Sequence, residues 1–150
     1  MYTSAELNTE LTTDPKGLGY AANITSTNDA ANAALINATT GPGAATVTLP
    51  SITRDQLAEL IAPVVLAFSS ASAAVQAQWQ PMLTLIDGIS TFNCTAANLG
   101  MLTELSAAFP NQLTAAQIAA ATTRMGSRAE VLWGVGTYVS WQQIAAALGR

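Results

Sequence analysis

The stretch DPKGLGY, residues 14–20, sets a lysine between a proline and two glycines. A phosphate-binding loop requires backbone N–H groups curled around the phosphates and a lysine that follows the second glycine of G-x-x-x-x-G-K-[ST]. Here Lys16 precedes Gly17 and Gly19, and the residues before this stretch have a helical pattern. The order of the residues therefore excludes a P-loop. It favours a turn that begins at the Asp-Pro dipeptide, with glycines at positive φ and a buried tyrosine.

Other groups suited to catalysis or metal binding are sparse. General acid–base catalysis most often uses histidine, which the chain lacks, and Cys94 is its one cysteine. Among nine scattered carboxylates, Asp55 and Glu59 lie one helical turn apart. That spacing is more often a solvated helix face than a metal site, and one pair gives too few oxygens for a calcium cage. We expect no enzymatic activity, no cofactor and no metal ion.

Two arginines lie in the last fifth of the chain, which is the part richest in patterns. Arg124 and Arg128 are spaced by one helical turn, and like charges at that spacing disfavour an isolated helix. We expect each to reach for a carboxylate, either Glu130 and Glu104 or carboxylates of a neighbouring subunit. The alternative is that both arginines lie in water.

Three large aromatic residues follow these arginines, around the tripeptide GVG: Trp133, Tyr138 and Trp141. Large aromatic side chains serve as core filling or as interface anchors, and core filling is the favoured interpretation. Together with the two arginines they make up the candidate subunit interface, which consists of Arg124, Arg128, Trp133, Tyr138 and Trp141.

The composition favours a protein that works within an assembly. Half of the 150 residues are hydrophobic and 9% are charged, against roughly 25% in an ordinary soluble domain. A free monomer usually keeps itself soluble with interspersed charge, so we expect other chains to cover much of this surface. The alternative is a compositional habit of the source. The net charge of −4 is thinly spread without a basic run, which argues against direct binding of nucleic acid.

One segment is long and apolar enough to be weighed as a membrane span. Residues 60–86 carry no charge and exceed the roughly 20 residues that a crossing needs. They also contain two prolines, several serines and three glutamines whose amides would be unsatisfied in lipid, so we expect no membrane span. The first ten residues have neither the basic start nor the apolar core of a secretory signal, and we expect none.

Helix starts are marked in three places by a capping box with a hydrophobic staple around it. Each box places Ser or Thr before the helix and Gln at its third position, and each cap contributes about 1 kcal/mol. The boxes predict helices that begin near residues 54, 115 and 141. The capping pairs are Thr53–Gln56, Thr114–Gln117 and Ser140–Gln143, and the staples are Ile52–Leu57, Leu113–Ile118 and Val139–Ile144.

Four more helices are predicted by apolar periodicity, over residues 5–11, 29–37, 72–86 and 96–109, with a kink or break at Pro81. Residues 38–50, ATTGPGAATVTLP, contain helix-breaking Gly-Pro-Gly and predict an exposed loop or arm that could extend a neighbour's sheet. The expected fold is all-α: a single helical domain over residues 1–150, a small irregular bundle of five to seven short helices with one extended loop or arm.

Three motifs lie toward the two ends of the chain. The first is L-x-x-D-P-x-G-x-G-Y over residues 11–20, the second is ALINA at 34–38, and the third is SRAEVLWGVG at 127–136. Together they resemble the motifs of a family of small structural proteins of tailed bacteriophages. The family more usually has leucine before the first glycine and arginine after it, whereas this chain has Lys16 and Leu18. The middle, from about residue 39 to 95, shares only a helical pattern.

The resemblance implies a virion accessory protein whose partners are other copies of itself and other phage structural proteins. The favoured expectation is an oligomeric head-to-tail connector or tail-associated component. One alternative is a capsid decoration or cement protein. Others are a non-virion tail-assembly factor and a small internal protein that is ejected with the genome.

Overall fold

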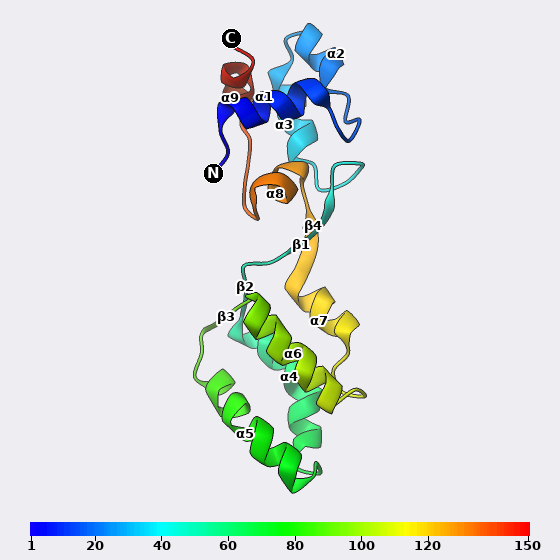
Figure 1. Ribbon diagram of the computed structural model, residues 1–150, viewed down its shortest axis with the longest axis vertical. Helices are drawn as coiled ribbons and strands as arrows, with labels where there is room; N and C mark the ends of the chain where they lie inside the picture. The colour runs from blue at the N-terminus through cyan, green and yellow to red at the C-terminus, as the bar shows by residue number, and fades with distance from the viewer. The chain divides into compact units, whose positions relative to one another are not determined.

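The computed structural model describes residues 1–150 and contains nine helices and four short strands (Figure 1). The protein is therefore mostly helical, and the predictions of a strictly all-α fold and of five to seven helices are wrong. The helices are α1 Ser4–Thr13, α2 Tyr20–Thr25, α3 Asp29–Asn37, α4 Arg54–Phe68, α5 Ala73–Asp87, α6 Ala96–Ala108, α7 Ala115–Thr122, α8 Arg128–Trp133 and α9 Trp141–Ala147.

The strands form two separate two-stranded sheets, which are β1 (Ala45–Thr48) with β4 (Thr123–Gly126) and β2 (Ser51–Thr53) with β3 (Thr91–Asn93). Strands β2 and β3 are antiparallel, and Ile52 lies opposite Phe92. Both of these side chains are buried, so this short pair adds two apolar groups to the core beside α4.

The three predicted capping boxes are confirmed, because α4, α7 and α9 begin where they were expected. In each box the hydroxyl oxygen accepts from the third helical N–H, and the glutamine accepts from the N–H of the capping residue. Both members of every staple are buried. Local sequence therefore marks these three helix starts, and burial of the staples ties each start to a core.

Periodicity also located α1, α3, α5 and α6 to within a few residues. The break expected at Pro81 does not occur, since α5 continues through it. Proline removes the hydrogen bond to the carbonyl of Ala77, and both residues are exposed, so water can satisfy that carbonyl. The short helices α2 and α8 were not expected.

The segment predicted as an exposed arm, residues 38–50, is partly paired with another strand. Residues 45–48 of it form β1 and pair with β4 of the same chain. Close packing requires a glycine on the opposite strand, because a Cβ at Gly126 would fall 2.7 Å from the methyl groups of Val47. The part of the predicted arm that could have extended a neighbour's sheet therefore pairs with a strand of its own chain.

The chain divides into two compact units. The first consists of residues 1–47 and 124–150, and the second consists of residues 48–123. Each unit has its own cluster of buried apolar side chains. The two units are defined by their packing contacts. That the whole chain folds as a single domain remains a prediction.

The first unit gathers α1, α2, α3, α8 and α9 around a small core (Figure 1). Contacts between α1 and α9 and between α3 and α9 bring the two ends of the chain together. The buried side chains come from every one of these helices, and they are Leu7, Leu11, Tyr20, Ala33, Ile36, Ala129, Val139 and Ile144.

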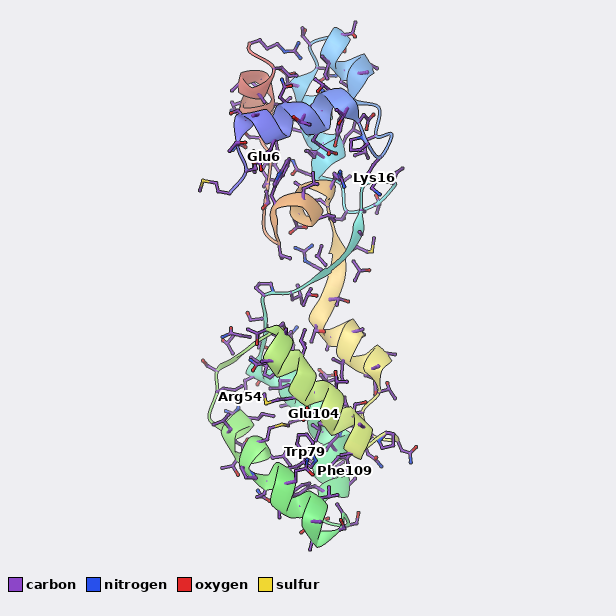
Figure 2. All side chains as sticks on the ribbon, in the orientation of Figure 1. Glu6, Lys16, Arg54, Trp79, Glu104 and Phe109 are labelled. Atoms are coloured by element: carbon purple, nitrogen blue, oxygen red, sulfur yellow. The ribbon has the colours of Figure 1, made fainter.

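The second unit is built from α4, α5, α6 and α7 with the β2–β3 pair (Figure 1). Its core is larger, with Leu57, Val64 and Leu105 fully buried, and Thr122 is the one buried polar residue of the unit. Trp79 of α5 and Phe109 after α6 are buried in the same cluster (Figure 2). Helix α5 contributes Trp79 and Ile86 to this core.

Candidate subunit interface

The two arginines of the candidate interface do not share a helix. Arg124 lies in β4 and Arg128 is the first residue of α8, with Ser127 between the two elements. Strand geometry separates the two guanidinium groups, which removes the like-charge spacing inferred from a helical pattern. Each binds a carboxylate of its own chain, as expected in part, but Glu104 is not one of them.

Arg128 and Glu10 form a buried bidentate ion pair in the first unit. Nε and one terminal nitrogen of the guanidinium each donate to a carboxylate oxygen at 2.8 Å, and both residues are less than 10% exposed. The hydrogen bonds to Glu10 raise the pKa of Arg128. The pair joins α1 to α8 across 118 positions of sequence, so it fixes the start of the chain against its last quarter.

Glu130 organises the turn after α8. Its carboxylate accepts from Arg124, from the N–H of Ser127 and from the N–H of Gly136. Because the Arg124 guanidinium and these donors favour the charged form, the pKa of Glu130 falls to about 2. Ser127 caps α8 in return, so the SRAE motif forms a further capping box at its helix start.

The DPKGLGY stretch adopts the turn that was predicted. Asp14 ends α1 in the left-handed conformation, and its two carboxylate oxygens accept from the N–H groups of Leu18 and Gly19 at 2.7 Å. Gly19, at φ +84°, allows the chain to enter α2, and Tyr20 is fully buried. Burial raises the pKa of Tyr20. Lys16 points outward from this turn (Figure 2) and belongs to no ion pair.

Asn37, in the ALINA motif, ties α3 to the segment before α9. Its side-chain nitrogen donates to the carbonyl of Val139 at 2.7 Å, and its oxygen accepts from the N–H of Val139 at 3.0 Å. All three motifs of the resemblance therefore lie in the first unit, and each contributes a contact that holds this unit together.

The three aromatic residues of the candidate interface differ in exposure. Trp133 is half-buried and stacks on Tyr2 with ring centroids 4.5 Å apart. Tyr138 is 69% exposed and Trp141 is 54% exposed, so core filling, the favoured interpretation, is wrong for these two. Sequence pattern missed this because Val139, between them, takes the buried position.

A second apolar surface was not anticipated. Val65, Leu66 and Leu85 in α4 and α5 are 50% to 82% exposed, and the two helices border a groove of about 560 Å³. We name it the α4–α5 groove; its lining includes Ile61, Val65, Leu66, Leu83 and Ile86, with Arg54 and Asp87 as its two charged residues. The signal was available, since this is the uncharged segment weighed as a membrane span.

The metal site and the membrane span considered from the sequence can be compared with the structure. Asp55 and Glu59 are both exposed on α4, and no three His, Cys, Asp or Glu side chains gather as a metal site would require. None of the helices is long and apolar enough to cross a bilayer. No family model, no curated protein and no solved structure matches the chain.

Proposed function

We propose that the protein is a bacteriophage virion structural protein. In this proposal it is an oligomeric component of the head-to-tail connector or the tail, and it acts by packing against copies of itself and other structural proteins. The observation that carries the proposal is that large apolar side chains are exposed on both units of a chain in which 9% of the residues are charged.

Exposure of this kind is unusual for a protein surrounded by water. Aromatic and aliphatic residues with few charges among them are the composition of the buried centre of an interface. The exposed set comprises Val65, Leu66, Leu85, Met125, Val131, Leu132, Tyr138 and Trp141. Covering these side chains in an assembly would remove them from water, which is a favourable contribution of about 25 cal/mol per Å².

The contacts made by the motif residues support the same proposal. The chemically distinctive side chains of the three motifs, Asp14, Asn37, Arg128 and Glu130, all engage groups of their own chain. Their hydrogen bonds rigidify the first unit, and a rigid unit is what a repeated structural subunit requires. Resemblance to tailed-phage virion components supplies the biological setting.

Quantitative mass spectrometry of purified particles of the phage that encodes the chain tests the proposal. A connector or tail ring gives about a dozen copies per particle, set by cyclic symmetry. Hundreds of copies would instead identify a capsid decoration protein. Absence from the particles would overturn the proposal and favour an assembly factor. Loss of the protein from particles after genome ejection would identify an internal protein.

A further inference from the structure

We propose that Tyr138 and Trp141 of one copy dock into the α4–α5 groove of a second copy. This inference rests on the proposed function, which requires contacts between copies, and it names the two surfaces that make them.

The donating surface is an exposed aromatic pair with a fixed backbone. Tyr138 and Trp141 flank Ser140, which caps α9, and Val139 between them is fully buried. Asn37 holds both the N–H and the carbonyl of Val139. Fixing the backbone in advance lowers the entropy cost of association, and Trp and Tyr are the residues most enriched among interface hot spots.

The receiving surface is the α4–α5 groove, whose volume of about 560 Å³ lies in the range of ligand pockets. Its walls are mainly aliphatic, and Leu66 is 82% exposed beside it. Arg54 and Asp87 lie 3.6 Å apart and leave the lining with no net charge. An exposed guanidinium among apolar walls also favours an aromatic ring as occupant.

Charge selects the partner surface. The segment from Val131 to Gly149 contains no charged residue, so the aromatic pair brings a neutral surface to a neutral groove. The second unit as a whole has one arginine against four carboxylates, a net charge of −3, whereas the first unit has four basic and five acidic side chains, a net of −1. A contact between two second units would set a net charge of −3 against −3, whereas a contact between a first unit and a second unit sets −1 against −3. The first unit of another copy is therefore the better occupant.

Such a contact joins two different surfaces and is heterologous. Each copy offers one aromatic pair and one groove, so every copy can both donate and receive. Contacts of this type generate closed rings when the rotation between copies closes, and open filaments when it does not.

A mixing experiment with two variants tests the inference. Trp141→Ala removes the donor and Leu66→Glu places a charge in the groove, and both positions are exposed, so the fold is retained. In analytical ultracentrifugation the natural chain should form concentration-dependent multimers. Each variant alone should self-associate at least tenfold more weakly. An equimolar mixture should form a heterodimer, because the donor of Leu66→Glu meets the intact groove of Trp141→Ala.

The matched control is Gln78→Glu, which adds the same charge at an exposed position of α5 outside the groove and should leave association unchanged. A natural chain that stays monomeric would overturn the inference. Either variant alone associating as strongly as the natural chain would overturn it too, as would a mixture that remains monomeric. These results are independent of particle composition. If the protein is present in purified particles but shows none of this mixing behaviour, only the further inference is wrong. If it shows the mixing behaviour but is absent from particles, only the proposed function is wrong.

Discussion

The two units of the protein are held together in different ways. In the first, ion pairs and side-chain amides connect segments far apart in the chain: Glu10 with Arg128, Asp29 with Arg150, and Asn37 with Val139. In the second, the core is apolar and the one ion pair, Arg54 with Asp87, is exposed and loose at 3.6 Å.

The difference explains how so few charges are used. All four arginines take part in ion pairs, three of them in the first unit, where one partner or both are largely shielded from water. A discontinuous unit needs contacts that specify which distant segments meet, and directional charged hydrogen bonds do that. A continuous unit of helices can rely on apolar packing, which is less directional.

The largest expected effect comes from Glu10→Gln. The substitution leaves the Arg128 guanidinium buried without a countercharge, which should lower the free energy of unfolding by about 3–5 kcal/mol. Hydrogen exchange measured by mass spectrometry should show lost protection in α1, α8 and α9. Peptides from α4 to α7 should keep their protection if the units open separately.

The control for that substitution replaces both partners. A double variant, Glu10→Met with Arg128→Met, removes both charges and should be less destabilised than either single variant, because no buried charge is left unpaired. A double variant as unstable as Glu10→Gln would show that the site depends on shape alone.

Leu57→Ala is the corresponding test of the second unit. Leu57 is fully buried in the second unit, and the cavity should cost about 3 kcal/mol. Lost protection should be confined to α4, α5, α6, α7 and the β2–β3 pair. Equal loss in α1 and α9 would mean that the chain unfolds as one cooperative domain, and the contrast between the units would then concern contacts only.

The smallest expected effect is the contribution of Glu130 to the pH dependence of the free energy of unfolding. The pKa of Glu130 is lowered to about 2 in the folded protein, below the value of about 4.3 in an unfolded chain. Its contribution, on the order of 1–2 kcal/mol because Arg124 is partly exposed, is present above pH 4.5 and is lost as the pH falls toward 2. Urea unfolding of the natural chain and Glu130→Gln should differ at pH 6 and converge near pH 2.

The matched control for this effect is Asp87→Asn, which removes the exposed pair with Arg54 in the second unit. It should change the free energy of unfolding by less than about 1 kcal/mol at pH 6. A change as large as that of Glu130→Gln would contradict the distinction between shielded and exposed pairs.

Local chemistry made much of the helical structure predictable. Capping boxes and staples located α4, α7 and α9, and apolar periodicity located α1, α3, α5 and α6. Two further boxes, Thr3–Glu6 and Ser127–Glu130, were legible in the sequence and would have marked α1 and α8. These features depend on residues three or four apart, which is why sequence alone reveals them.

The contacts that define the site were not predictable in the same way. Nothing in the sequence pairs Glu10 with Arg128, since 118 positions separate them and several other carboxylates were available. The exposure of Tyr138 and Trp141 depends on which residue of their segment faces the core, and Val139 takes that position because Asn37 holds its backbone. Long-range packing decides both.

The paired strands β1 and β4 have a consequence for how the chain can vary. Just beyond them, the N–H of Leu49 donates to the carbonyl of Thr122 at 2.8 Å, so the second unit leaves and rejoins the rest of the chain between hydrogen-bonded neighbours. A cassette whose ends already touch can be lengthened, exchanged or replaced by a two-residue hairpin without rerouting the backbone around it. The middle of the chain is thereby free to diverge in sequence and length while its ends keep their joint architecture.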